Sequence, residues 1–258
     1  MIIDTHAHYD DERFDEDRDE LLLGMRAKGV DIIVNASAAL KGCYDSARLA
    51  DKYDFMYFMA GIHPSETLDL EEAGVFEEVR KMAEHEKCVA IGEIGLDYYW
   101  DEPDRDIQKK WFVAQLALAK DMGKPVNIHS RDAAADTLDI MKAEGAESVG
   151  GIIHCFSYGV EMAREYLNMG FHIGVGGVVT FKNGKKLKEV VEYAPLDRIV
   201  LETDCPYLAP EPFRGHRNHS GYMELVAERI AELKGVTREE VIRVTRENAL
   251  RVYNKNIT

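Results

Sequence analysis

The strongest constraint in this sequence is a regular alternation of short β-branched runs with longer amphipathic stretches. Such an alternation predicts parallel strands that are joined by helical crossovers. We expect eight of these runs to be strands: Ile2–Thr5, Ile32–Asn35, Met56–Ala60, Val89–Gly92, Pro125–Ile128, Ile152–Ile153, Phe171–Val175 and Ile199–Thr203. Successive runs begin 19 to 36 residues apart, which leaves room for one strand, one helix and two loops each time. The sequence therefore predicts an α/β fold, the (β/α)8 TIM barrel.

The segments between these runs have the residue spacing of helices. From Asp104 to Met122 apolar residues recur mostly every three or four positions, and Gly123 and Pro125 then act as a stop signal. The segment from Thr237 to about residue 253 begins with a capping box and predicts a C-terminal helix. No linker or low-complexity tract interrupts residues 1–258, so we expect a single domain, which this length allows.

The composition restricts the partners and the location of the chain. Its 47 Asp and Glu residues outnumber 32 Lys and Arg residues, for a formal net charge of −15. Binding of duplex nucleic acid by a broad, positively charged surface is therefore excluded. The four cysteines form no CxxC pair and follow no secretion signal, so we expect reduced thiols and a cytoplasmic protein. No apolar run is long enough to cross a membrane, and we favour a monomer although the sequence leaves the oligomeric state open.

Residue types that bind metals follow five of the eight predicted strands. In such a barrel the chemistry gathers where the strands end, because the following loops form one face. Four histidines and two carboxylates occupy these strand ends: His6, His8, Glu93, His129, His154 and Asp204. A single histidine in such a place is more often a hydrogen-bonded core residue. Six such groups at equivalent points would be costly without a ligand, so we interpret them as a metal site.

The number of ligands favours two divalent ions rather than one. Six groups exceed the three protein ligands that a catalytic zinc site usually takes, and a carboxylate can bridge two cations. We assign to the first ion His6, His8, Glu93 and Asp204, and to the second ion Glu93, His129 and His154. Two neighbouring ions would activate a water molecule and stabilise a leaving oxygen, so hydrolysis is the predicted reaction.

Several longer motifs contain these residues. They are DTHAHYDD at 4–11, GIHP at 61–64, EIGLDYYW at 93–100, PVNIHSRDA at 125–133, HCFS at 154–157 and LETDCPYLAP at 201–210. In this order they resemble the TatD family of metal-dependent deoxyribonucleases, within the amidohydrolase superfamily, over essentially the whole chain. The resemblance implies a (β/α)8 barrel with a divalent-metal centre at the six residues named. It also implies hydrolysis of DNA phosphodiester bonds, often as a 3′–5′ exonuclease that prefers single-stranded ends.

The resemblance also bears on the metal and on one loop. It implies that Mg or Mn supports activity, although imidazole ligands also admit Zn, Ni or Fe. After Gly215 the family commonly continues with a lysine and Asn-Glu-Pro, whereas residues 216–220 here read HRNHS. Arg217 and Asn218 remain in this stretch, and we expect both to bind substrate. The missing Glu-Pro pair leaves the substrate preference of this loop open.

Other candidate residues lie beside the predicted ligands. Arg131 has a planar guanidinium that suits a phosphate, unless it forms a surface salt bridge instead. His63 could donate a proton to a phosphate oxygen or a leaving group, or it could cap a helix. Glu202 could position or deprotonate water, a role that the ligands Glu93 and Asp204 could share, or it could support a nearby cation.

Base stacking by an aromatic residue is one further possibility, and two other classes of function are alternatives to a nuclease. Tyr98, Tyr99 or Trp100 could stack on a base, and of these we name Tyr98 as a substrate contact, although aromatic side chains more often serve in packing. A hydrolase of a small ester, lactone or amide is the alternative function. Many such enzymes bridge their metals with a modified lysine on the fourth strand, where this chain has Glu93. A binding protein with a vestigial metal site is a third possibility, which the intact ligand set argues against.

Overall fold

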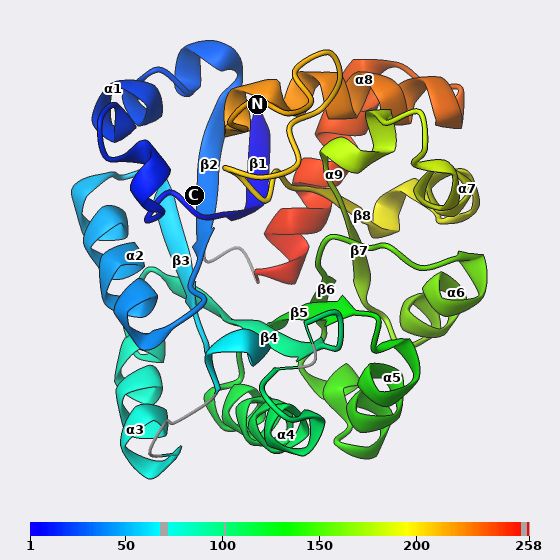
Figure 1. The fold of residues 1–258 in the computed structure, drawn as a ribbon. Coiled ribbons are helices and arrows are strands. Elements are labelled where there is room, and N and C mark those ends of the chain that lie inside the picture. The colour runs from blue at the N-terminus through cyan, green and yellow to red at the C-terminus, as the bar shows by residue number, and fades with distance from the viewer. Residues whose placement is uncertain (68–71, 101, 254–256, 258) are drawn as a thin grey trace.

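The computed structural model describes residues 1–67, 72–100, 102–253 and 257 of the chain (Figure 1). Within this part, eight parallel strands form one sheet in the order of the sequence. They are β1 (Ile2–Ala7), β2 (Val30–Ala36), β3 (Met56–Ala60), β4 (Cys88–Asp97), β5 (Val126–Arg131), β6 (Gly151–Ile153), β7 (His172–Val175) and β8 (Ile199–Leu201). A bridge between Ala7 and Cys205 brings β1 and β8 together, so the sheet is a nearly closed barrel. The predicted (β/α)8 barrel is confirmed.

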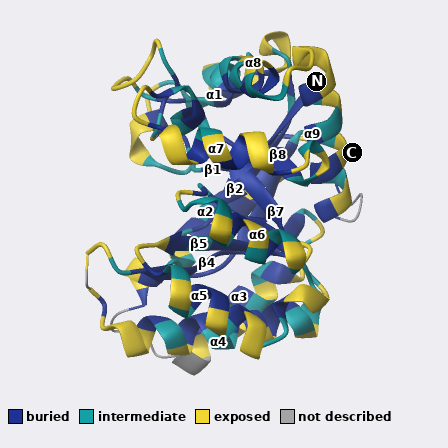
Figure 2. Ribbon diagram, turned by 90° about the vertical axis from the view of Figure 1, so that its right-hand side faces the viewer, coloured by how far each residue is buried: buried dark blue, intermediate teal, exposed yellow. Residues whose placement is uncertain are grey.

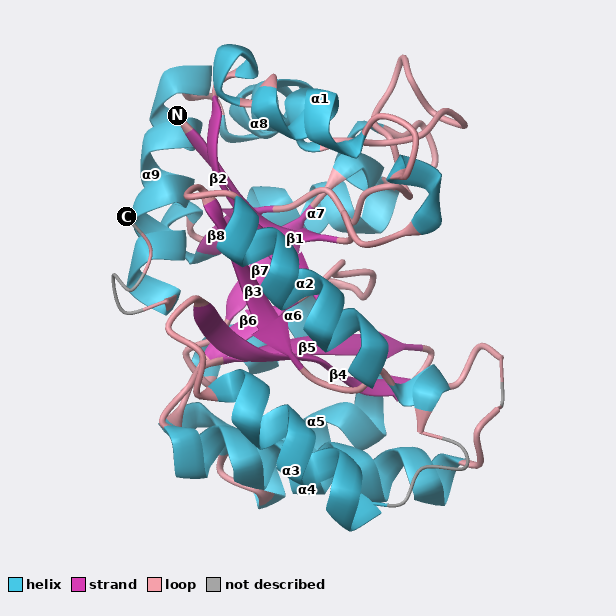
Figure 3. Ribbon diagram, turned by 90° about the vertical axis from the view of Figure 1, so that its left-hand side faces the viewer, coloured by secondary structure: helices cyan, strands magenta, loops and turns pink. Residues whose placement is uncertain are grey.

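Helices surround this barrel and expose their outer faces, while the strands in the centre are buried (Figure 2). The described residues form α1 (Arg18–Leu23), α2 (Leu40–Lys52), α3 (Glu72–Ala83), α4 (Arg105–Met122), α5 (Ala134–Ala143), α6 (Val160–Asn168), α7 (Lys185–Tyr193), α8 (Met223–Lys234) and α9 (Arg238–Val252). None of these helices is both long and apolar enough to cross a membrane. Figure 3 shows long loops gathered at one end of the barrel, away from the two termini.

The two helices that the sequence located most clearly begin and end where their capping residues predict. Asp104 accepts a hydrogen bond from the backbone N–H of Asp106 at the start of α4, and Gly123 ends this helix with a φ of 61°. Thr237 Oγ1 accepts a hydrogen bond of 3.1 Å from the backbone N–H of Glu240 at the start of α9. The side chains of Asp104 and Thr237 therefore satisfy N–H groups that each helix itself leaves unpaired.

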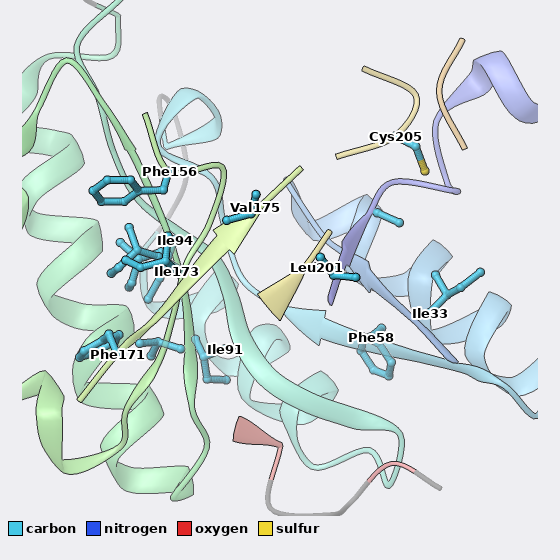
Figure 4. Packing of buried hydrophobic residues seen from close by; sticks show 14 of the residues in the cluster. Ile33, Phe58, Ile91, Ile94, Phe156, Phe171, Ile173, Val175, Leu201 and Cys205 are labelled. Carbon is cyan, nitrogen blue, oxygen red and sulfur yellow. The ribbon is translucent and has the colours of Figure 1, made fainter. Parts of the chain in front are cut away.

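Two buried apolar clusters lie on the two faces of the sheet. Successive strand residues point to opposite faces, so Phe58 belongs to the first cluster and Tyr57 to the second. The first cluster also contains helix residues such as Phe112 and lies between the sheet and the helices; Figure 4 shows part of it. The second cluster joins strand residues to α9 and the residues after it, including Tyr253. It fills the interior of the barrel at the end that α9 closes.

Strand β4 extends further than the sequence pattern indicates. The predicted run ended at Gly92, but pairing with β5 continues through Gly95, opposite His129, as far as Asp97, opposite Arg131. A Cβ atom at Gly95 would collide with the backbone of His129, so glycine allows the close approach of the two strands. The two glycines interrupt the β-branched run, which is why the pattern ended too early.

Candidate metal centre

The strand ends bring the six predicted ligands together at the mouth of the barrel. His6 lies in β1, His8 follows it, Glu93 and His129 lie in β4 and β5, His154 follows β6, and Asp204 follows β8. All except His6 line a cavity of about 740 Å³. Cys155 and Asp204 have left-handed backbone conformations, with φ of 43° and 57°. Such conformations are uncommon for residues other than glycine, and here they turn the chain sharply at Asp204 and directly after His154.

The four residues assigned to the first ion have the spacing of atoms that share one metal ion. Metal–nitrogen bonds of roughly 2.0–2.1 Å place neighbouring ligand atoms about 2.9–3.4 Å apart. His6 Nε2 lies 3.1 Å from His8 Nε2 and 3.4 Å from Glu93 Oε2. His8 Nε2 lies 3.3 Å from Asp204 Oδ1. Two further pairs are wider, His6 Nε2 to Asp204 Oδ1 at 3.9 Å and His8 Nε2 to Glu93 Oε2 at 3.8 Å, so the four donors suit one divalent ion after small shifts.

Hydrogen bonds on the far side of the rings hold His6 and His8 in this orientation. His6 Nδ1 donates to Asn127 Oδ1 at 2.9 Å, and His8 Nδ1 donates to the carbonyl oxygen of Ala36 at 3.1 Å. Because each Nδ1 carries the proton of the neutral ring, two Nε2 lone pairs face each other at 3.1 Å. That arrangement is unfavourable unless a proton or a metal ion lies between them. Outer hydrogen bonds of this kind orient histidine ligands and raise their basicity.

Carboxylates orient the other two histidines. His129 Nε2 donates to Asp97 Oδ2 at 3.0 Å, while its Nδ1 lies 2.8 Å from Glu93 Oε1. His154 Nδ1 donates to Glu202 Oε2 at 3.1 Å, and its Nε2 lies 3.7 Å from Glu93 Oε1. Ligand atoms of Glu93, His129 and His154 lie within 4.8 Å of one another. These three residues could hold a second ion, and Glu93 faces both groups.

The charges in this cluster stabilise one another. Burial raises the pKa of Glu93, but its interactions with the imidazoles of His6 and His63 and the hydrogen bond from His129 hold it well below its usual range. Burial opposes a charge on His129, but its hydrogen bonds to Asp97 and Glu93 raise its pKa to about 9. The carboxylates therefore stay ionised, and a metal ion must compete with protons on the imidazoles.

His63 lies in the same cavity with a defined tautomer. Its Nδ1 accepts a hydrogen bond of 3.2 Å from the backbone N–H of Ser65, as an N-cap does. The neutral ring therefore carries its proton on Nε2, which lies 3.8 Å from Glu93 Oε1. Burial and the charge of His129 lower the pKa of His63 to about 3, so the ring is neutral and presents an N–H group.

Arg131 and Tyr98 lie in different surroundings although both were predicted to bind substrate. Arg131 lines the cavity, its guanidinium lies 3.8 Å above the ring of Tyr99, and it has no carboxylate partner in the described part of the chain. The hydroxyl of Tyr98 donates to Asp136 at 2.7 Å. Tyr98 is half-buried and is not among the described residues that line the cavity, whereas the neighbouring Trp100 is.

Arg217 and Asn218 make contacts within the protein. The guanidinium of Arg217 forms two hydrogen bonds with the carboxylate of Asp17, at 2.5 and 2.8 Å. Asn218 is buried, and its Nδ2 donates to the carbonyl oxygen of Thr203 at 2.9 Å. Among the described residues, neither belongs to the cavity lining. Both side chains instead fix the loop after β8 against neighbouring segments.

The sequence analysis missed two residues that orient the predicted ligands, Asp97 and Asn127. Asp97 holds His129, and Asn127 holds His6. Alternation along a strand contains a signal for both residues. Asn127 is two positions before His129, and Asp97 is four positions after Glu93, so each shares a strand face with a predicted ligand. Only the early end assigned to the fourth strand concealed Asp97.

Comparisons with known proteins agree with this geometry. A family model described as TatD related DNase matches residues 3–254. The uncharacterized metal-dependent hydrolase YabD of Bacillus subtilis (strain 168) is 47% identical over 244 residues, which cover 95% of each chain. A protein of Rahnella sp. (strain Y9602) that is named 3′–5′ ssDNA/RNA exonuclease TatD is 31% identical over 229 residues, covering 86% of this chain and 87% of its own. The solved structure of YJJV, a TatD homologue from Escherichia coli K12, superposes with a TM-score of 0.92 at 29% identity and covers 98% of both chains.

Proposed function

This chain belongs to the family of TatD-related DNases and is a metal-dependent hydrolase, and from that premise we propose that it hydrolyses DNA phosphodiester bonds. We propose further that it acts as a 3′–5′ exonuclease on single-stranded ends, as the name of the Rahnella relative suggests. The observation that carries the proposal is the convergence of the oriented histidines on a cavity that also holds Arg131, a cation with no carboxylate partner among the described residues. A phosphate is the substrate group that such a combination binds best.

Two divalent ions belong to this proposal. His6, His8, Glu93 and Asp204 would hold the first ion, and Glu93, His129 and His154 the second. When bound, such ions acidify a water molecule and stabilise negative charge on a phosphate. Mg or Mn is the proposed metal for activity, and the imidazole ligands also suit Zn, Ni or Fe.

The protein groups around the ions have separate proposed tasks. Arg131 binds a non-bridging phosphate oxygen, and the Nε2–H group of His63 donates to the phosphate or to the leaving oxygen. Asp204 lines the cavity, and its proposed task is to accept a proton from a water molecule. Glu202 is fully buried, and its two oxygens already accept from His154 Nδ1 and from the backbone N–H of Cys155. Glu202 is therefore a positioning residue for His154.

The remaining expectations concern the whole chain. We propose that residues 1–258 act as one domain and as a monomer, in the cytoplasm. All four cysteines are free thiols, which suits a reducing compartment. With a net charge of −15, the protein would hold DNA through the local site rather than through its general surface.

A labelled oligonucleotide assay tests this proposal. A single strand, a duplex and an RNA of one sequence are incubated with protein that carries Mg²⁺, Mn²⁺ or Zn²⁺. We expect the single strand to shorten from its 3′ end, and Glu93→Gln to lower the rate by about a thousandfold or more, because it removes the shared carboxylate. Glu78→Gln, at a carboxylate that pairs with Lys81 on α3, is the matched control. Uncut DNA, or faster turnover of lactones or phosphotriesters, would contradict the proposal.

A further inference from the structure

The cavity at the metal centre has two unlike walls. In sheet order, β4 and β5 lie opposite the junction of β8 and β1, so loops from these two pairs of strands face each other across the barrel mouth (Figure 1). Trp100 and Arg131 line the first wall, and Asp10, Asp11 and Tyr207 line the second. The predicted metal ligands lie between the walls. A substrate bound at the centre must therefore contact both.

The first wall combines exposed aromatic surface with an unpaired cation. Trp100 is 66% exposed and Tyr99 is 54% exposed, and their ring centroids lie 4.9 Å apart. Arg131 stacks on Tyr99 and has no carboxylate partner among the described residues. Exposed rings stack on bases without regard to sequence, and a free guanidinium attracts backbone phosphate. This wall suits the body of a strand, in which a phosphate follows every nucleoside.

The second wall has an aromatic ring but an excess of negative charge. Tyr207 is 49% exposed, and the guanidinium of Arg13 lies 4.1 Å from its ring centroid. Asp11 accepts two hydrogen bonds from the guanidinium of Arg13, at 3.0 and 2.8 Å, so these two charges cancel. Asp10 accepts from the neutral amide of Asn35, at 2.7 Å, and the described residues form no ion pair with it, although its charge contributes to the raised pKa of His8. The net charge of this wall is therefore negative beside the cavity.

A negatively charged wall interacts differently with the end of a strand than with its interior. A terminal nucleoside carries a free hydroxyl, which can donate a hydrogen bond to a carboxylate. A nucleoside within a strand carries a phosphate at the same place, and two like charges that are close and partly shielded from water repel strongly. We propose that Asp10 and Tyr207 bind the terminal nucleoside and that Asp10 excludes a continuing strand, while Trp100 and Arg131 bind the strand body. This inference rests on the proposed function and names its substrate: a linear strand with a free 3′ hydroxyl.

Three substrates of one sequence test the role of Asp10. The first strand ends in a 3′ hydroxyl, the second ends in a 3′ phosphate, and the third is closed into a circle. For the wild type we expect kcat/KM to be at least about tenfold lower for the 3′ phosphate than for the hydroxyl, and the circle to remain uncut. Asp10→Asn should raise the phosphate-to-hydroxyl ratio of kcat/KM by roughly tenfold, because the repelling charge is gone.

A matched control separates this local effect from the change in net charge. Asp45 on α2 pairs with Lys41 and Arg48 and does not belong to the described lining of the cavity. Asp45→Asn changes the net charge by the same amount, and it should leave the ratio at the wild-type value. An equal rise of the ratio in Asp45→Asn would overturn the proposal.

Fluorescence provides a second readout that does not depend on turnover. The chain has two tryptophans, and Trp111 is buried, so quenching by an added strand reports on Trp100. Strands with a phosphorothioate at the last linkage are used to slow hydrolysis. Both the hydroxyl and the phosphate strand should quench Trp100, and the ratio of their Kd values should approach one in Asp10→Asn.

The possible outcomes separate this inference from the proposed function. Cleavage of DNA with the same substrate ratio in wild type and Asp10→Asn overturns the inference alone. Cleavage of the circle at the rate of the linear strand also overturns it and leaves DNA hydrolysis standing, as does binding without any change in Trp100 fluorescence. If metal-loaded wild type cuts none of the strands, the proposed function fails and the inference fails with it.

Discussion

The two ends of the barrel use the same eight strands for opposite purposes. At the end that α9 closes, the interior contains apolar side chains such as Ile32 and Val200, and Tyr253 packs against them. At the mouth, the same strands or the residues just after them present imidazoles and carboxylates, each hydrogen-bonded to a further group. Apolar burial stabilises the fold at the first end. Buried polar groups at the second end would destabilise it without those partners.

This contrast teaches that stability and chemistry reside in separate layers of one barrel. A change at the closed end should alter the free energy of unfolding and leave the chemistry intact. A change at the mouth should alter metal binding with a smaller effect on folding. Variants at either end therefore test whether stability and chemistry are separate.

The largest effect on stability is expected from Ile32→Ala at the closed end. Ile32 is buried on β2, which contributes no predicted metal ligand, and truncation leaves a cavity in the barrel interior. We expect the free energy of unfolding to fall by about 2–5 kcal/mol, with metal content unchanged. Denaturant titration and metal analysis measure the two quantities. Ile107→Ala, at an exposed position of α4, is the control and should cost less than about 1 kcal/mol.

The second prediction concerns pH and the mouth of the barrel. Burial opposes a charge on His8, but the hydrogen bond to Asp204 and the charges of Asp204 and Glu93 raise its pKa to about 9. The pKa of His129 is also raised to about 9. Without metal, the folded state binds these protons more tightly than the unfolded chain does. Their stabilisation is therefore complete below pH 6.5 and is lost as the pH rises through 9.

Bound metal should reverse this trend, because it must displace the same protons. Its apparent affinity should rise about tenfold per pH unit for each proton displaced, so that the two Tm curves approach or cross. Thermal unfolding at pH 6, 7.5 and 8.5, with either a chelator or Mn²⁺, measures both curves. A parallel pH dependence of the chelated and the metal-loaded protein would show that the imidazoles are not the groups that the metal engages.

The smallest effect is expected from a residue that contacts a predicted metal ligand without being one itself. Asp97→Asn removes the charge that orients His129, and we expect metal affinity to fall about 10–100-fold with little loss of stability. Competition with a chelator of known affinity measures the change. Asp136→Asn, at a surface carboxylate that accepts from Tyr98 and pairs with Lys109, should leave the affinity unchanged. Equal affinities for Asp97→Asn and wild type would show that the charge of Asp97 is not needed to orient His129.

Strand β4 is longer in the structure than its sequence pattern predicts. The β-branched run located this strand, and Glu93 was placed at its end, but Gly92 and Gly95 made the strand look complete. Pairing with β5 carries the strand on to Asp97. A strand's length depends on its neighbour as well as on its own residues, so a single run of sequence underestimates it.

Loop residues were harder to predict than strand residues for a related reason. The position of Arg217 in the chain suggested a substrate contact, but its guanidinium meets Asp17, about two hundred residues earlier, in a bidentate pair. Of the three aromatic residues Tyr98, Tyr99 and Trp100, we expected Tyr98 to bind substrate, whereas Trp100 lines the cavity. The direction of a loop side chain is determined by contacts between distant segments, which leave no periodic signal in the sequence.

The sequence by itself determined the barrel and the residue types at its strand ends. Both follow from local rules: alternation requires parallel strands with crossovers, and parallel strands place their C-terminal ends on one face. Only the tertiary structure decided which nitrogen of each histidine faces the cavity, which carboxylates orient the rings and which cavity wall is negative. These features depend on distances of about 3 Å between residues far apart in the chain, such as His6 and Asn127 at 2.9 Å. Hydrogen bonds at that range are fixed by packing, which no local pattern encodes.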